Sequence, residues 1–304
     1  MSLDRLIKKI DEKGNPSVVG LDVDFGKLPG FLQNEAIMRY DETLRAAARA
    51  VLMFNKALID ALCDIIPAVK LQCAYYELLG HEGMKTFAET ITYAKKKGLF
   101  VICDGKRNDI GSTMEAYAAA HLGSVTVGTK TLKPFGADAL TVNGYLGTDG
   151  IVPLLDICNK YDKGIFVLVK TSNPSSGELQ DMNIEGTTVF GIMGVMCEKW
   201  GERTKFKHGY SAVGAVVGAT YPEQLSKLRE ELPGTFFLVP GYGAQGGSAE
   251  DVAGAFRKGK GAIINSSREI IYAYQNEDGS EKDYAAAARR AAIRMKNKLH
   301  RVIS

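Results

Sequence analysis

Phe100-Val-Ile-Cys-Asp-Gly-Lys-Arg-Asn-Asp-Ile-Gly-Ser-Thr113 is the stretch that decides the fold, because an apolar run ends there in three charged groups. Residues 99–103 are predicted to form a buried strand. Asp104 and Lys106 stand two positions apart, so a continued pleat directs both side chains to the same side. Asp109 lies beyond the predicted strand end.

A helix is predicted directly after these charged groups. Residues 112–115, Ser-Thr-Met-Glu, have the S-x-x-E form of a capping box, which marks a helix start. The charged groups therefore occupy a loop between a strand and a helix. Parallel α/β folds carry their chemistry in such loops.

Seven further short apolar runs predict strands on either side of this stretch. They cover residues 17–22, 67–71, 137–143, 164–170, 212–217, 235–240 and 261–265. Helical segments are predicted between them at 82–97, 113–122, 150–159 and 250–257, and a last one follows with apolar residues from Tyr284 to Leu299 on one face.

Two connections are longer than one crossover helix requires. Residues 28–62 predict a long helical excursion after the first strand. An insertion between the fifth and sixth strands contains its own helix, since apolar residues from Val189 to Trp200 recur at helical spacing. Its apolar stripe is interpreted as packing.

The number and character of the strands predict the fold class. Short, apolar, non-alternating strands separated by helices indicate a parallel sheet that is buried on both sides. Eight such units favour a closed (β/α)8 TIM barrel over an open doubly wound sheet. No G-x-G-x-x-G follows the first strand, as a dinucleotide-binding fold would require. Because no linker rich in Pro, Ser or charge interrupts the chain, residues 1–304 are predicted to form one domain.

Composition excludes several classes of partner. A net charge of +3, without runs of Lys and Arg among aromatic residues, does not indicate nucleic-acid binding. No apolar run approaches about 18 residues and the N-terminus lacks an apolar signal core, so a cytoplasmic protein is expected. The five cysteines include no C-x-x-C and the four histidines no ligand-spaced pair, which predicts reduced cysteines and no zinc site.

The predicted barrel brings charged residues of three consecutive strands to one rim. The carboxyl ends of the strands, where barrel active sites lie, carry Asp22, Lys70, Asp104, Lys106 and Asp109. Each of these residues alone could belong to a surface ion pair of little energetic weight. Their alternating charges together indicate a site.

A phosphate site is predicted at the last two strands. Residues 239–247, Val-Pro-Gly-Tyr-Gly-Ala-Gln-Gly-Gly, follow the seventh strand and could approach an anion with backbone N–H groups. Residues 265–268, Asn-Ser-Ser-Arg, follow the eighth strand and add a guanidinium, Arg268, for two-pronged binding. A glycine-rich loop alone is more often a turn, but loops after strands seven and eight are the common phosphate site of barrels.

The motif D-x-K-x-x-D at 104–109, followed by Ile-Gly-Ser-Thr at 110–113, resembles the signature of the orotidine 5'-phosphate decarboxylase family. The resemblance covers residues 17–275. Its longer-chain bacterial branch, type 2, is indicated by the segments at 141–143, 171–174 and 218–222. Gly144 departs from the family pattern, where proline is expected.

This resemblance implies an activity. The family converts orotidine 5'-monophosphate (OMP) to UMP, the last step of de novo pyrimidine synthesis, without a cofactor or metal ion. The implied catalytic residues are Lys106, which protonates C6, together with Asp104, Asp109 and Lys70. The implied partner is this small-molecule substrate.

The resemblance also implies how the substrate is held. Asp22 would bind the ribose, Ser172 the pyrimidine edge, and Gln245 and Arg268 the 5'-phosphate. The remaining implied binding residues are Ile110, Thr113, Pro240 and Ser267. In the family the loop with Asp109, Ile110 and Thr113 crosses into the partner subunit, which implies a homodimer with shared sites.

Two alternatives stay open at this point. A metal-dependent sugar-phosphate decarboxylase or lyase of the same barrel carries a similar D-x-K-x-x-D, but the keto-gulonate relatives place an acid at the end of strand two, where this chain has Lys70. A non-catalytic nucleotide-binding regulator is the second alternative, and retention of both lysines and all three acids argues against it. Whether Asp24, Asn143 or Lys170 contacts a ligand is left undecided.

Overall fold

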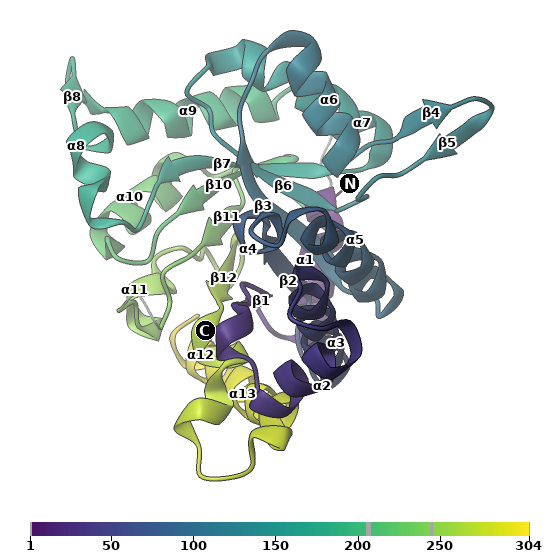
Figure 1. Ribbon diagram of the computed structural model, residues 1–304. Helices are drawn as coiled ribbons and strands as arrows, with labels where there is room; N and C mark the ends of the chain where they lie inside the picture. Colours follow the sequence, from purple (N-terminus) through teal and green to yellow (C-terminus); the bar gives the residue numbers. More distant parts are fainter. Residues whose placement is uncertain (1, 205–207, 244–245, 304) are drawn as a thin grey trace.

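The structure is a computed structural model and describes residues 2–204, 208–243 and 246–303. Its centre is a closed barrel of eight parallel strands, and β12 pairs with β1 to close it (Figure 1). The predicted (β/α)8 barrel is therefore confirmed. The strands are β1 (Ser17–Gly20), β2 (Ala68–Gln72), β3 (Phe100–Arg107), β6 (Ala139–Val142), β7 (Gly164–Lys170), β10 (Val213–Val217), β11 (Phe237–Val239) and β12 (Ala262–Ser266).

Helices lie around this barrel, as the pattern of the sequence predicts (Figure 1). In the described ranges, no helix combines the length and the apolar character needed to cross a membrane. The longer ones are α1 (Ser2–Lys13), α2 (Gly30–Tyr40), α3 (Leu44–Leu62), α5 (Gly80–Lys96), α6 (Gly111–His121), α7 (Val152–Tyr161), α9 (Val189–Gly201), α10 (Pro222–Glu231) and α13 (Tyr284–Ile303). Shorter ones are α4 (Cys73–Glu77), α8 (Gly177–Gln180), α11 (Ala249–Ala253) and α12 (Arg268–Ile271).

The two long connections have the positions that were predicted. The excursion after β1 forms α2 and α3. The insertion after β7 contains α8, a small hairpin of β8 (Asn183–Ile184) and β9 (Thr187–Thr188), and the predicted helix α9. Elements that were not predicted include α1, α10 and a hairpin of β4 (Val125–Val127) and β5 (Lys130–Leu132) that projects from the barrel (Figure 1).

Alternation along the strands divides the core into two layers. Side chains such as Val19, Val69 and Val101 point outward and pack against the helices. Their neighbours Val18, Ala68 and Phe100 point inward and form a separate cluster inside the barrel. Leu3, Leu6 and Ile7 of α1 join this inner cluster. The inner cluster also contains the first residues of several strands, so α1 closes the amino-terminal end of the barrel. The carboxyl end is left for a site.

The predicted helix start after the charged stretch is wrong. Strand β3 continues to Arg107, so Asp104 and Lys106 belong to the strand itself. This shortens the following loop, and α6 begins at Gly111 with Ile110 as its N-cap and no side-chain cap. Ser112 therefore lies inside the helix, where it cannot form the predicted capping box.

His121, at the end of α6, gives a prediction for stability. Burial, with a smaller contribution from the charge of Arg107, lowers the pKa of His121 to about 4 from the ordinary value of 6.5. As the pH falls from 6.5 to about 4, the unfolded chain binds a proton that the folded chain does not. This one group should lower the free energy of unfolding by roughly 3 kcal/mol across that window.

Urea denaturation of wild type and of His121→Leu at several pH values measures this contribution. The variant should lose less stability than wild type as the pH falls from 7 to 5. His81→Leu is the matched control, because the His81 side chain is 93% exposed. Parallel pH profiles for wild type and His121→Leu would contradict the assignment.

Candidate active site

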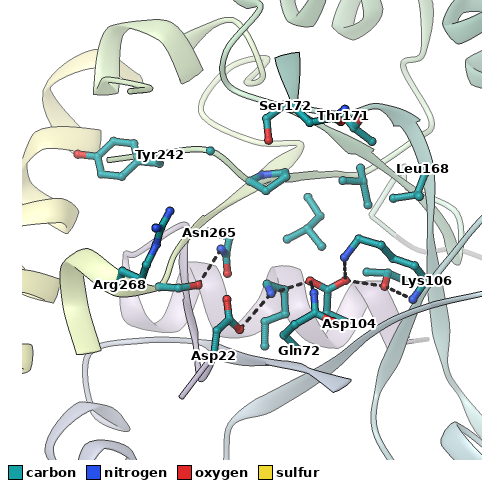
Figure 2. A pocket seen from close by; sticks show the side chains of 18 of the residues that line it. Asp22, Gln72, Asp104, Lys106, Leu168, Thr171, Ser172, Tyr242, Asn265 and Arg268 are labelled. Atoms are coloured by element: carbon teal, nitrogen blue, oxygen red, sulfur yellow. Dashed lines mark hydrogen bonds and ion pairs between the residues drawn. The ribbon is translucent and has the colours of Figure 1, made fainter. Parts of the chain in front are cut away.

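A chain of alternating charges lies across the carboxyl end of the barrel. Lys70 Nζ is 2.7 Å from Asp104 Oδ2 and 3.6 Å from Asp22 Oδ1. Lys106 Nζ is 2.7 Å from the other Asp104 oxygen, Oδ1. The order Asp22, Lys70, Asp104, Lys106 follows the adjacent strands β1, β2 and β3. Figure 2 shows Asp22, Asp104 and Lys106 along this edge of the cavity. The prediction that Asp104 and Lys106 point to the same side is confirmed.

The environment keeps the central members of this chain charged. Burial alone would lower the pKa of Lys70, but the carboxylates of Asp104 and Asp22 outweigh it and raise that pKa. Burial would likewise raise the pKa of Asp104, but Lys70 and Lys106 hold it well below its usual range. Asp104 is therefore a buried carboxylate that stays ionised at neutral pH.

Two neutral side chains complete the surroundings of Asp104. The Thr141 hydroxyl donates to Asp104 Oδ1 at 2.8 Å, and Gln72 Nε2 donates to Oδ2 at 3.2 Å. The backbone N–H of Lys106 donates to the Thr141 hydroxyl at 3.0 Å. Both oxygens of the carboxylate are thus held by a cation and a neutral donor, which fixes its direction.

The backbone of Lys106 has an unusual conformation. Its φ is +47°, in the left-handed region that residues other than glycine rarely adopt. Such conformations are seen where surrounding contacts impose them, often at functional sites. Here the hydrogen bond to Thr141 and the ion pair to Asp104 hold Lys106 on both sides.

A cavity of about 730 Å³ opens above these charges. Its lining includes eight of the residues predicted for the site, which come from six strands or the loops after them. They are Asp22, Lys70, Asp104, Lys106, Ser172, Pro240, Ser267 and Arg268. Figure 2 shows Arg268 and Ser172 on the side of this cavity away from Lys106.

The loop that carries Ser172 is held by the insertion after β7. Gln180 of α8 accepts a hydrogen bond from the Thr171 backbone N–H at 2.9 Å and donates to the Thr171 hydroxyl at 2.7 Å. On the other side, a Cβ at Gly218 would lie 2.9 Å from the Ser172 backbone nitrogen. The close approach of β10 therefore requires glycine at 218, and the two contacts fix Ser172 at the cavity.

Two glycines of the predicted phosphate loop have positive φ angles, a backbone conformation that glycine adopts readily. Gly241 and Gly243 have φ of +99° and +73°. The Gly243 N–H donates to the Gly247 carbonyl at 2.8 Å, which closes the loop on itself. Arg268, the first residue of α12, is exposed beside this loop. Gln245 lies outside the described residues.

Three predicted site residues do not reach the cavity of their own chain. Asp109, Ile110 and Thr113 are absent from its lining. Asp109 Oδ1 accepts a hydrogen bond from the Ile110 N–H at 2.8 Å, and Ile110 is 52% exposed. Within the single chain, the loop thus lies outside the cavity that holds the charge network.

The undecided residues are also outside the cavity lining. Asp24 accepts a hydrogen bond from the Gly26 N–H, and Asn143 accepts one from the Tyr145 N–H. Lys170 is fully buried and forms an ion pair with Asp181 at 2.7 Å.

Sequence reasoning missed polar residues of the cavity, among them Gln72, Thr141 and Asn265. Alternation on the strands could have identified Gln72 and Asn265, since each stands two positions from a predicted site residue, Lys70 and Ser267. In the described part of the chain, no group of three His, Cys, Asp or Glu side chains could hold a metal ion.

Eight parallel strands in a closed barrel, with a buried charge network under a cavity at their carboxyl ends, define a (β/α)8-barrel enzyme. Residues 48–282 match the family described as "Orotidine 5'-phosphate decarboxylase / HUMPS family". The chain belongs to this family.

Similar proteins agree with this assignment along the whole chain. A protein of Rhodopirellula baltica named "Orotidine 5'-phosphate decarboxylase" is 44% identical over 291 residues, which are 94% of each chain. One of Caldicellulosiruptor saccharolyticus with the same name is 40% identical, over 93% of this chain and 94% of its own. The crystal structure of a putative orotidine-monophosphate-decarboxylase from Toxoplasma gondii aligns with a TM-score of 0.78 and 28% identity, covering 99% of this chain and 97% of that one.

Proposed function

We infer that the chain catalyses the decarboxylation of OMP to UMP, the reaction that its family and the names of its relatives support. The observation that carries the proposal is the Asp104 carboxylate, held between Lys70 and Lys106 beneath a cavity large enough for a nucleotide. A fixed array of charges suits this reaction because loss of CO2 leaves an electron pair on C6, and no neighbouring group of the pyrimidine can accept it.

We propose that Asp104 acts on the carboxylate that leaves the substrate and that Lys106 acts on the carbon, C6, that loses it. A substrate carboxylate bound near the Asp104 carboxylate is repelled, by roughly 4 kcal/mol for unit charges about 4 Å apart at an effective dielectric near 20. Cleavage of the bond from C6 to the carboxylate releases neutral CO2 and removes this repulsion. The electron pair that stays on C6 is stabilised by the Lys106 cation, which then donates its proton to C6. Lys106 afterwards regains a proton from solvent.

Remote binding groups must hold the substrate against this repulsion. Arg268 and the Gly241–Gly247 loop are proposed to bind the 5'-phosphate, with Gln245. Asp22 and Lys70 are proposed to bind the ribose, and Ser172 with Pro240 the pyrimidine. Ser267, which precedes Arg268 in the chain, is proposed to contact the phosphate as well. Binding energy at these distant groups offsets the unfavourable contact at the reacting carbon.

Adding OMP to the purified chain in the presence of EDTA, and following the pyrimidine absorbance, tests the proposed function. Full turnover with EDTA is expected. Loss of activity that added divalent metal restores would instead favour a metal-dependent sugar-phosphate decarboxylase or lyase. Binding of UMP without turnover at saturating OMP would favour a nucleotide-binding regulator.

Arg268→Ala should impair the chemical step as well as binding. The binding energy of the phosphate holds the substrate carboxylate in the charge network. We therefore expect kcat to fall and KM to rise together. Loss of one charge-assisted contact predicts a decrease of kcat/KM by roughly 10- to 10²-fold. Steady-state kinetics with OMP measures both constants. An unchanged kcat would mean that the phosphate is only an anchor.

We further propose that residues 1–304 form one domain and work as a cytoplasmic homodimer. All five cysteines are free thiols, which suits a reducing compartment. Ile110, Tyr145 and Leu146 expose 52%, 76% and 45% of their surface at loops after β3 and β6. In the dimer Asp109, Ile110 and Thr113 would enter the partner's cavity, so that each site receives one further carboxylate from the other subunit.

A further inference from the structure

Two buried acceptor oxygens in the cavity receive no hydrogen bond from the residues that the structure describes. Asn265 is only 7% exposed, and its carboxamide oxygen Oδ1 has no hydrogen-bond partner among the described residues. The Asp22 oxygen Oδ1 is likewise buried without a hydrogen bond within the described ranges, and its nearest cation, Lys70 Nζ, is 3.6 Å away. Buried polar atoms are rarely left without partners in proteins. This pair therefore indicates a ligand that supplies donors.

Asn265 and Asp22 belong to one corner of the cavity. Both line it, and Figure 2 shows the Asn265 carboxamide next to the Asp22 carboxylate. They project from β12 and from the end of β1, two strands that pair with each other. Gly20 of β1 lies against Asn265 and Ser267: a Cβ there would be 3.3 Å from Asn265 Oδ1 and 1.9 Å from the Ser267 hydroxyl oxygen. The missing side chain at Gly20 leaves the room that these polar groups occupy.

Contacts within the chain do not explain why a polar residue stands at this position. To the described part of the chain, the Asn265 amide nitrogen donates only a long hydrogen bond, 3.3 Å, to the Ser267 hydroxyl. Val216 and Leu238, the inward residues of the two preceding strands that also line the cavity, are apolar. An apolar residue at 265 would continue this floor without a buried unpaired acceptor.

We propose that the Asn265 carboxamide oxygen and the Asp22 carboxylate together accept hydrogen bonds from the vicinal hydroxyls of the substrate's ribose, which makes Asn265 a determinant of selectivity for ribonucleotides. This inference rests on the proposed function. A ribose carries two adjacent O–H donors, and the corner holds two adjacent acceptors. The location also fits, because Figure 2 shows it between Arg268, proposed for the phosphate, and Asp104 of the charge network.

Substrate analogues combined with a substitution test the contact. Asn265→Ala should lower kcat/KM for OMP by about three- to tenfold, the effect of one hydrogen bond to an uncharged group. If Asn265 binds a hydroxyl, this loss should disappear with either 2'-deoxy-OMP or 3'-deoxy-OMP, because the lost partner is already absent. Wild type should in turn discriminate against that same analogue more strongly than Asn265→Ala does.

An equal loss with OMP and with both analogues would overturn the inference. It would mean that Asn265 only positions the site, for example by donating its amide N–H to Asp22. Ser266→Ala is the matched control, since Ser266 is the next residue of β12 and is buried outside the cavity lining. Its kinetics should equal those of wild type.

Two further measurements keep the result interpretable. Asn265→Leu has the shape of asparagine without its polar atoms, and it replaces Asn265→Ala if that variant does not fold. Calorimetric binding of UMP and of its 2'-deoxy and 3'-deoxy forms gives the same comparison without catalysis. If wild type neither binds UMP nor turns over OMP, the proposed function fails. If wild type does both and the Asn265 effect is the same for every ligand, only this inference fails.

Discussion

Lys106→Ala should bind OMP and UMP but lose decarboxylation, with kcat lower by at least about 10⁴-fold. The substitution removes both the cation that stabilises the electron pair on C6 and the proton that C6 receives. Asp104 should remain in position, since Lys70, Gln72 and Thr141 still hold its two oxygens. Single-turnover kinetics with OMP and calorimetric binding of UMP separate the two effects.

Two control variants distinguish the charge of Lys106 from its proton. Lys106→Arg keeps a cation, but a guanidinium hardly loses its proton, so turnover should stay low. Lys227→Ala makes the same change at a lysine whose side chain is 68% exposed on α10, and its activity should be normal. Turnover of Lys106→Ala within tenfold of wild type would exclude Lys106 as the proton donor.

A mixture of Lys106→Ala and Asp109→Ala should regain activity that neither variant has alone. If Asp109 enters the partner's cavity, a mixed dimer has one site with both substitutions and one with neither. Free exchange of subunits makes about half of the dimers mixed, so roughly a quarter of the wild-type activity should return. The assay is OMP turnover after exchange, with mixed dimers counted by native mass spectrometry.

The matched control is a mixture of Lys106→Ala and Asp104→Ala. These two side chains belong to the same site of the same chain, with 2.7 Å between Lys106 Nζ and Asp104 Oδ1. Every site of a mixed dimer then keeps one substitution, and no recovery is expected. If the Asp109 mixture also fails to recover while mixed dimers are present, the shared site is excluded.

All eight barrel strands could be predicted because each is a short apolar run that must be buried on both faces. The hairpin of β4 and β5 could not, since its strands are exposed and carry no core pattern. Helix α1 was missed for a different reason: Leu3, Leu6 and Ile7 are buried against the inside of the barrel, a contact that exists only after the barrel has closed. Local patterns do not reveal such tertiary contacts.

The site was predictable to a similar degree. Charged residues at strand ends, such as Asp104 and Lys106, are identified by the abrupt end of an apolar run. Asn265 has a weaker signal, its spacing of two positions from Ser267, because a single amide in a strand otherwise resembles any polar residue near a turn. The false capping box at Ser112 arose because β3 extends four residues beyond its predicted apolar part, as far as Arg107. The last residues of β3 are thus the charged site residues themselves, which an apolar pattern does not assign to a strand.

The left-handed backbone of Lys106 has a consequence for how this enzyme can evolve. Any L-residue at φ +47° costs about 1–2 kcal/mol that glycine would not. The position that holds the proposed proton donor is therefore one where the fold alone would favour glycine. Selection for activity and selection for stability oppose each other at this single residue. A lineage released from the need for catalysis would be expected to lose this lysine early, while its barrel remained intact.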